Sequence, residues 1–262
     1  MTNKHGDFVW YELMTTDAAA AQDFYTGLIG WNWADSGQDG VDYRVFSAGS
    51  EQIGGMLALN EEMTAGGARP AWLGYVQTDD LSGALSKWKA AGGSVMIEGQ
   101  EVPGVGPFAM VTDPQGVPLY LIDDQSGEES TAFSAYEPKV GHCAWNELVT
   151  ADPGAAKSFY GDIYGWVVGE SMDMGPMGQY EMLKNGEARD FMFGAVMKKP
   201  DEMPVSAWAY YFRVPDIDAA QAYIEEKGGQ IMNGPMEIPG GDFVIQGSDP
   251  QGAFFSIIGA RK

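Results

Sequence analysis

Two glutamates, Glu12 and Glu147, each stand two residues after a tryptophan, Trp10 and Trp145. Residues two apart in a β-strand point to the same face of the sheet, so each carboxylate is expected beside an indole. A carboxylate against an apolar wall should have a raised pKa, and that environment suits a general acid or base. The alternative is that each glutamate accepts backbone or indole N–H hydrogen bonds and supports the architecture. Both interpretations stay open here, and so does the question whether the chain is an enzyme.

The same alternation adds one residue to each of these two faces. Phe8 joins the first face, and Cys143 joins the second. Cys143 is the chain's one cysteine, so an internal disulfide is impossible. Because the first face has Phe8 at the matching position, a packing thiol is favoured over a nucleophile. A cavity walled by aromatic rings with one carboxylate suits a flat, apolar or partly cationic small molecule.

The chain contains one sequence pattern twice. WYELMTTDAAAAQDFYTGLIGW and WNELVTADPGAAKSFYGDIYGW, which begin at Trp10 and Trp145, are identical at 11 of 22 positions with an offset of 135. Later residues recur at offsets of 136 or 137: Tyr43 and Tyr180, Trp72 and Trp208, Tyr75 and Tyr211, and DPQG at Asp113 and Asp249. One ancestral domain is therefore present twice. We expect domains at 6–125 and 139–260, joined by a polar linker over 126–138.

Each copy has the pattern of a strand, a helix and three strands, and this pattern occurs twice per copy. In the first copy Asp17 is a suitable helix N-cap, and Gly30 is a suitable helix end. A second helix is expected between Asp80 and Gly92, with strands over 8–15, 31–35, 42–48, 52–59, 72–78, 94–98, 106–112 and 118–122. The DPQG segments are predicted to be hairpin turns without a chemical role. The chain is thus four β-α-β-β-β units, which is an α+β fold.

This order of strand, capping aspartate, helix ending in FY and GW, and terminal D-P-x-G turn resembles the vicinal oxygen chelate superfamily. That superfamily includes glyoxalase I, the bleomycin-resistance proteins and the extradiol dioxygenases. The resemblance implies tandem domains whose curled mixed sheets surround open cavities. The W-x-E-L opening and the two-domain length are most similar to the subset described as glyoxalase-like or hydroxylase-like antigens.

The resemblance also implies where a metal ion would be held. The family takes one ligand from the first strand of a unit and one from its last strand. The first-strand positions, seven residues before each capping aspartate, are Trp10, Trp145, Leu73 and Ala209. The last-strand positions are Tyr120, Ser256, Met56 and Ala195. None of these is His, Cys, Asp or Glu, and the two histidines, His5 and His142, lie outside these positions. We therefore expect no metal and no cofactor, with Tyr120 as a further ligand-contacting residue.

Charge and composition restrict the partners. Lys and Arg total 15 and Asp and Glu total 37, for a net charge of −22. Such a polyanion is a poor partner for nucleic acid and for anionic membranes. The start of the chain lacks the pattern of a secretory signal, and no apolar run could span a bilayer, so a cytoplasmic location is expected. One chain supplies four units, so a monomer can complete the fold, and the oligomeric state stays open.

These observations favour a metal-independent glyoxalase-like protein that binds or sequesters a small apolar or aromatic molecule, as bleomycin-resistance proteins do. One alternative is a lyase, isomerase or hydroxylase-like enzyme that uses Glu12 or Glu147 as acid or base. Another is a metal-dependent glyoxalase or dioxygenase, if the protein holds a metal. A further alternative is an interaction protein with vestigial cavities.

Overall fold

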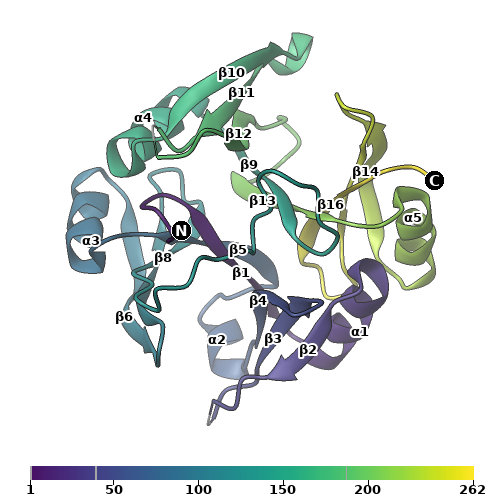
Figure 1. The fold of residues 1–262 in the computed structure, drawn as a ribbon, viewed down its shortest axis with the longest axis horizontal. Helices are drawn as coiled ribbons and strands as arrows, with labels where there is room; N and C mark the ends of the chain where they lie inside the picture. The colour runs from purple at the N-terminus through teal and green to yellow at the C-terminus, as the bar shows by residue number, and fades with distance from the viewer. Residues whose placement is uncertain (1, 39, 187) are drawn as a thin grey trace. The chain divides into compact units, whose positions relative to one another are not determined.

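The computed structural model describes residues 2–38, 40–186 and 188–262. The first repeat contains β1 (Phe8–Thr15), α1 (Ala18–Ile29), β2 (Asn32–Asp35), β3 (Tyr43–Ala48), β4 (Glu51–Ala58), α2 (Glu61–Ala65), β5 (Ala71–Gln77), α3 (Leu81–Ala90), β6 (Ser94–Val102), β7 (Gly106–Thr112) and β8 (Pro118–Ile122) (Figure 1). The second contains β9 (Cys143–Thr150), α4 (Pro153–Tyr164), β10 (Val167–Asp173), the 3₁₀ turn η1 (Gly175–Met177), β11 (Gln179–Lys184), β12 (Met192–Lys198), β13 (Ala207–Arg213), α5 (Ile217–Glu226), β14 (Gln230–Glu237), β15 (Phe243–Ser248) and β16 (Phe254–Gly259).

The expected α+β class with four β-α-β-β-β units is confirmed. The Asp17 side chain accepts the N–H of Ala20 at the start of α1, and Gly30 ends the helix with φ of 91°. Sixteen residues of the first strand and helix thus follow local signals, whereas the short helix α2 was not predicted. Among the described residues, every helix is too short or too polar to cross a lipid bilayer.

The strands form two mixed sheets of eight, with the orders β2-β3-β4-β1-β5-β8-β7-β6 and β10-β11-β12-β9-β13-β16-β15-β14. The first strand of each unit pairs in parallel with its last strand, as β1 does with β4 and β9 with β12. The remaining neighbours within a unit are antiparallel, as in β3 with β4. This topology places the first and last strands of every unit side by side, so their side chains share a face.

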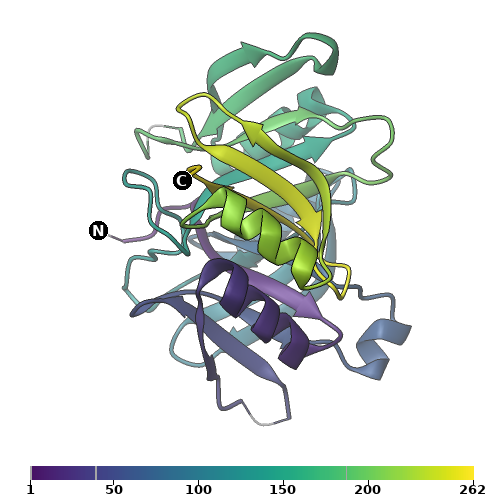
Figure 2. The same cartoon turned by 90° about the vertical axis from the view of Figure 1, so that its right-hand side faces the viewer.

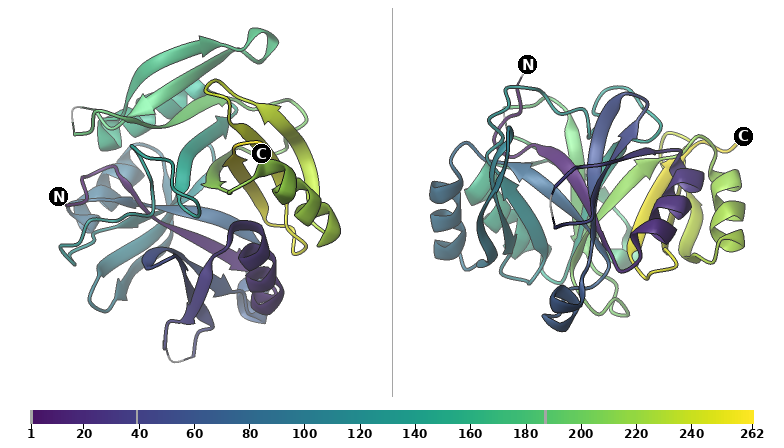
Figure 3. Two further views of the ribbon diagram at one scale, coloured as in Figure 1. Left: turned by 45° about the vertical axis from the view of Figure 1, so that its right-hand side comes forward. Right: turned by 90° about the horizontal axis from the view of Figure 1, so that it is seen from below.

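Two compact units cut across the two sequence repeats. Unit 1 comprises residues Met1–Val9, Gly74–Ser130 and Trp145–Trp208, and unit 2 comprises Trp10–Leu73, Thr131–Ala144 and Ala209–Lys262. Each unit therefore combines one half of the first repeat with one half of the second. In unit 2, α1 and α5 lie side by side (Figures 2 and 3).

A buried relay in unit 2 begins at a tryptophan and ends at a DPQG turn. The Trp72 indole N–H donates to the Tyr25 hydroxyl over 3.0 Å, and that hydroxyl donates to Asp249 Oδ2 over 3.0 Å. The other Asp249 oxygen accepts the N–H groups of Gln251 and Ala253 within the turn. Burial raises the pKa of Asp249, although these hydrogen bonds act in the opposite direction. The turn aspartate therefore ties helix α1 to the end of the chain.

Unit 1 contains the matching relay. Trp208 donates to the Tyr160 hydroxyl over 3.3 Å, and Tyr160 donates to Asp113 Oδ2 over 3.1 Å. Burial raises the pKa of Asp113 as well. The helices α3 and α4 pack together in this unit through Trp88 and Phe159, whose ring centroids are 4.7 Å apart. The predicted hairpin turns are therefore also packing elements.

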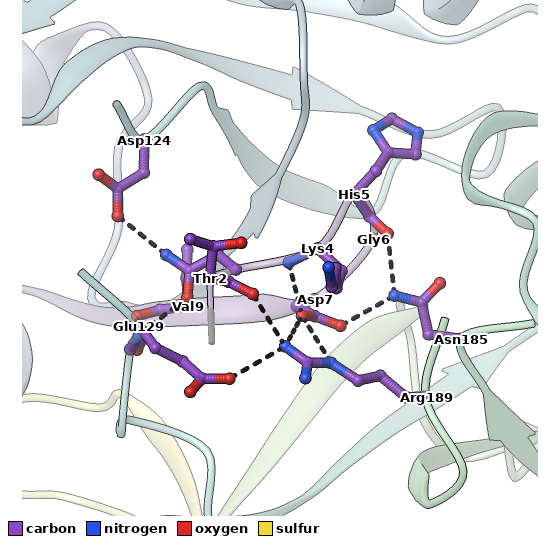
Figure 4. Close-up of polar contacts among 12 residues, drawn as sticks. Thr2, Lys4, His5, Gly6, Asp7, Val9, Asp124, Glu129, Asn185 and Arg189 are labelled. Carbon is purple, nitrogen blue, oxygen red and sulfur yellow. Dashed lines mark hydrogen bonds and ion pairs between the residues drawn. The ribbon is translucent and has the colours of Figure 1, made fainter. Parts of the chain in front are cut away.

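The N-terminal segment is held within unit 1 by one arginine. Arg189 donates to Asp7 Oδ2 from Nη2 over 2.6 Å and from Nε over 3.0 Å (Figure 4). The same guanidinium reaches Glu129 over 3.4 Å, and Asn185 donates to Asp7 Oδ1 over 2.8 Å. Asp7 and Arg189 are each 13% exposed at the side chain. Because Asp7 directly precedes β1, this cluster anchors the chain at the entry to the first strand.

Candidate functional site

In unit 1, the second of the two predicted faces contains a Trp-Tyr-Glu relay. The Trp145 Nε1–H donates to the Tyr180 hydroxyl over 2.7 Å, and Tyr180 donates to Glu147 Oε2 over 2.7 Å. Trp145 is half-buried, whereas Glu147 is 6% exposed. The carboxylate is thus reached by a tyrosine hydroxyl, and the tryptophan keeps part of its surface accessible.

Unit 2 repeats the arrangement at the first face. Trp10 donates to the Tyr43 hydroxyl over 3.1 Å, and Tyr43 is hydrogen-bonded in turn to Glu12, which is 3% exposed. Burial and then the charge of Glu12 raise the pKa of Tyr43 well above its ordinary value. Tyr43 therefore stays protonated and donates to the carboxylate.

The tyrosines reach the carboxylates across a strand that carries a small residue at the crossing point. Glu12 is in register with Gly55 of β4, and Glu147 with Ala195 of β12. A β-carbon at Gly55 would lie 1.9 Å from the Tyr43 hydroxyl, so the phenol passes directly over this glycine.

The register corrects one expected last-strand position. Met56 pairs with Leu13 and is fully buried, so Gly55 and not Met56 shares the face of Glu12. Ala195 does occupy the expected position beside Glu147. The first-strand assignment of Trp10 and Glu12 to one face agrees with their contacts with Tyr43.

Two of the predicted ligand-contacting residues are packed inside the protein. Phe8 is 5% exposed and contacts the rings of Trp166, Phe193 and Trp208. Cys143 is fully buried, and its backbone forms a β-bridge with Phe133 of the linker. Neither side chain presents a surface to a ligand without rearrangement, so the tryptophans are the accessible members of the two faces.

Tyr120 lies in an aromatic stack in unit 1. Its ring is 4.2 Å from that of Tyr75 with an interplanar angle of 15°, and Phe108 packs against both. Tyr120 is 3% exposed and Tyr75 5% exposed. The stack fills the space that a smaller residue at position 120 would leave.

A cavity of about 410 Å³ lies elsewhere in unit 2, lined by residues that include Trp31, Gly141, His142, Glu51 and Lys139. Its charged groups contact one another, since Glu51 is 3.1 Å from Lys139 and 3.4 Å from His142. The hydrogen bonds of Lys139 and the charge of His142 outweigh the effect of burial and lower the pKa of Glu51. This cavity does not include the Trp-Tyr-Glu relay.

The donor set was compared with the requirements of a divalent metal. A metal ion held in the family manner needs about three or four N or O ligands that converge on one point. Within residues 2–38, 40–186 and 188–262, no group of three or more His, Cys, Asp or Glu side chains is placed to hold one. The two relays each supply one carboxylate, and Tyr43 and Tyr180 already hydrogen-bond to these carboxylates. The residues present do not fit the metal centre that the family resemblance implies.

Both repeats match one family model. Residues 7–121 and 139–257 match the Glyoxalase/Bleomycin resistance protein/Dioxygenase superfamily. The chain belongs to this superfamily. The resemblance inferred from the capping aspartates, helices and D-P-x-G turns is thereby confirmed.

Two full-length relatives of this superfamily member have informative names. The chain is 32% identical over 253 residues to CFP32 of Mycobacterium tuberculosis (strain CDC 1551 / Oshkosh), a provisionally named glyoxylase, with 95% of this chain and 93% of that protein covered. It is 29% identical over 273 residues to the anthracycline biosynthesis protein DauV of Streptomyces sp. (strain C5), with 97% and 93% covered.

Solved structures confirm the superfamily fold. The Mn(II)-bound glyoxalase from Novosphingobium aromaticivorans aligns with a TM-score of 0.65 at 16% identity, over 99% of this chain and 83% of that one. The 2,2',3-trihydroxybiphenyl 1,2-dioxygenase from Sphingomonas wittichii strain RW1 aligns with a TM-score of 0.65 at 11% identity, over 98% and 91%. At these identities the likeness concerns the fold alone.

Sequence reasoning did not find the hydroxyl groups that complete the relays. Tyr43 and Tyr180 were recognised as a recurring pair, but not as partners of Glu12 and Glu147. The signal that could have found them is their equal spacing from the two glutamates, within two residues in the two copies. Their reach across β4 and β12 depends on the small residues at Gly55 and Ala195.

Proposed function

We propose that this protein binds a small, flat, apolar or aromatic molecule against the Trp145 indole, and against Trp10 in the other repeat, without a metal ion. The observation that carries the proposal is the contact of Trp145 with Tyr180. Because the indole N–H is already bonded to the Tyr180 hydroxyl, the accessible remainder of the half-buried tryptophan is carbon. Such a surface favours an apolar or aromatic partner, with a carboxylate nearby.

The name of one relative supports this ligand class. DauV is named for anthracycline biosynthesis, and anthracyclines contain a planar, fused aromatic ring system. A cationic amino group on such a ligand would also be attracted by the net charge of −22. Binding or sequestration needs only a shaped surface, which agrees with the poor fit of the donor set to a metal.

Doxorubicin fluorescence provides the test, in buffer with enough salt to suppress non-specific attraction. Trp10→Leu, Trp145→Leu and the double variant should weaken the Kd, by tenfold or more in the double variant, which corresponds to about 1.4 kcal/mol. Trp33→Leu is the matched control, because Trp33 is also half-buried but bonds to Thr26. Equal affinity of the wild type and the double variant, or no binding by folded wild type, would refute the proposal.

A second candidate function is proton transfer, favoured by the 2.7 Å contact between Tyr180 and Glu147. Glu147 would accept a proton from a carbon or oxygen of the bound molecule, and Tyr180 would orient the carboxylate. Glu147→Gln keeps an acceptor for Tyr180 but removes the basic oxygen. If the protein is such an enzyme, Glu12→Gln combined with Glu147→Gln abolishes turnover and leaves affinity within about tenfold. Unchanged turnover excludes this role.

Metal analysis of the purified protein tests the metal-free part of the proposal. The expected result is metal well below one equivalent per chain after dialysis. Tightly held, stoichiometric zinc, nickel, manganese or iron would overturn it, because the family's metal-dependent chemistry would then have a centre.

A further inference from the structure

Four polar side chains form a row across the last unit of the chain, entirely within unit 2. Asn233 pairs with Gln246, Gln246 with Ser256, and Ser256 with Tyr211, on the neighbouring strands β14, β15, β16 and β13. Partners in register share a face of the sheet, so all four side chains belong to one face. Asn233 donates to Gln246 Oε1 over 3.2 Å, and Gln246 donates to the Tyr211 hydroxyl over 2.7 Å.

Ser256 lies beneath the contact between Gln246 and Tyr211, because its strand separates theirs. Its side chain is fully buried, and its hydroxyl has no hydrogen-bond partner among the described residues. Buried polar groups in proteins are nearly always hydrogen-bonded, since an unmet hydroxyl loses its water without compensation. The Ser256 hydroxyl therefore requires an external partner.

The matching unit of the first repeat shows what an apolar version of this face contains. At an offset of 136, the equivalents of Asn233, Gln246, Ser256 and Tyr211 are Ile97, Met110, Tyr120 and Tyr75. There Tyr120 stacks on Tyr75 and needs no further partner to fill the face. Serine in place of tyrosine removes an aromatic ring, and the two long neighbours become amides. The change is thus from a filled apolar face to a polar one.

Exposure along the row indicates a direction of entry. Asn233 is exposed, Gln246 is half-buried, and Ser256 and Tyr211 are buried. A ligand group that enters past Asn233 meets the amide of Gln246 before the hydroxyl of Ser256. None of the four side chains is charged, so the row offers neutral hydrogen-bonding groups only.

We propose that this row, which we name the Ser256 row (Asn233, Gln246, Ser256 and Tyr211), binds the hydroxyl or carbonyl oxygen of a small neutral molecule, with Ser256 as its direct partner. The site is separate from the Trp-Tyr-Glu relays and does not depend on the function proposed for them. It also distinguishes the two repeats, because only the second has the polar row.

The test uses p-cresol and toluene, which differ by one hydroxyl group. In ¹H–¹⁵N spectra of the full chain, the Gln246 side-chain amide is identified by its loss in Gln246→Met. p-Cresol should shift this resonance, and toluene should not. Ser256→Ala, which removes the hydroxyl and retains the volume, should weaken p-cresol binding at least fivefold without lowering the Tm. Ser256→Tyr, which copies the first repeat, should abolish the shift.

Two controls keep the result specific. Tyr120→Ser alters the equivalent position of the first repeat and should leave the Gln246 titration unchanged. Trp10→Leu with Trp145→Leu should also leave it unchanged, so failure of this site and failure of the proposed function are distinguishable. Equal shifts by toluene and p-cresol would overturn the proposal. So would the absence of any shift in wild type, in which case Ser256 is satisfied by a water molecule only.

Discussion

The Tyr43 hydroxyl lies 1.9 Å from the position that a β-carbon at Gly55 would occupy. This close approach lets the phenol cross β4 and contact both Trp10 and Glu12. In the second repeat the equivalent position is Ala195, and Tyr180 still reaches Glu147 over 2.7 Å. The two relays are therefore chemically alike but differ in how much room the crossing strand leaves.

Gly55→Ala should displace Tyr43 and break the first relay. The buried carboxylate of Glu12 would then lose its tyrosine donor, so we expect a loss of about 1–3 kcal/mol in the free energy of unfolding. Urea unfolding measures the loss, and Trp10 fluorescence reports the lost contact with Tyr43. Ala195→Gly is the matched control, with a loss below about 1 kcal/mol. Equal effects of the two substitutions would contradict this account of the crossing.

The relay that ends at Asp249 predicts a pH dependence. Burial raises the pKa of Asp249 above its ordinary value of 3.8, so the group stabilises the fold fully below that ordinary value. This contribution is lost as the pH rises through the raised pKa. Asp249→Asn retains an oxygen for the turn N–H groups but does not titrate. The difference in free energy of unfolding, wild type minus variant, should therefore decrease from about pH 3 to about pH 6.

The same measurement on Asp113→Asn should give a change of the same sign, because burial raises the pKa of Asp113 too. A pH-independent difference for both variants would show that the native pKa values are not raised. A difference that grows with pH would show the opposite shift.

Removal of Arg189 should release the N-terminal segment. Arg189→Ala leaves the carboxylate of Asp7, which is 13% exposed, without its cationic partner. We expect a loss of about 2–4 kcal/mol and faster hydrogen exchange at the backbone amides of Gly6 and Asp7. Lys89→Ala, which breaks a pair exposed by 53% and 65% at its two side chains, serves as the control and should change stability by less than about 1 kcal/mol. Unchanged exchange in Arg189→Ala would exclude an anchoring role.

Local signals in the sequence were sufficient for the elements, because each depends on a few neighbouring residues. Asp17 and Gly30 bound α1 as expected, since an N-cap and a positive φ are properties of the adjacent backbone. The helix α2 escaped prediction because its five residues are too few to show a helical period. The position of Met56 was wrong because strand register is decided by pairing with β1, which the spacing along the chain does not specify.

The candidate site was only partly predictable, since its contacts join distant strands. Alternation placed Trp145 and Glu147 on one face, which depends only on β9 itself. The hydroxyl of Tyr180 comes from β11 and passes over β12, and no local pattern indicates this path. Likewise, the DPQG turns were predicted from their residues, but the second carboxylate oxygen of Asp113 is used by Tyr160 of another repeat.

The composition of the two compact units limits how this gene could be divided. A cut between the repeats would separate α1 from α5 and α3 from α4, so both compact units would lose half of their residues at once. Tyr25 would be parted from Asp249, and Tyr160 from Asp113. Although the chain arose by doubling, neither copy can be discarded independently: the duplication has become irreversible.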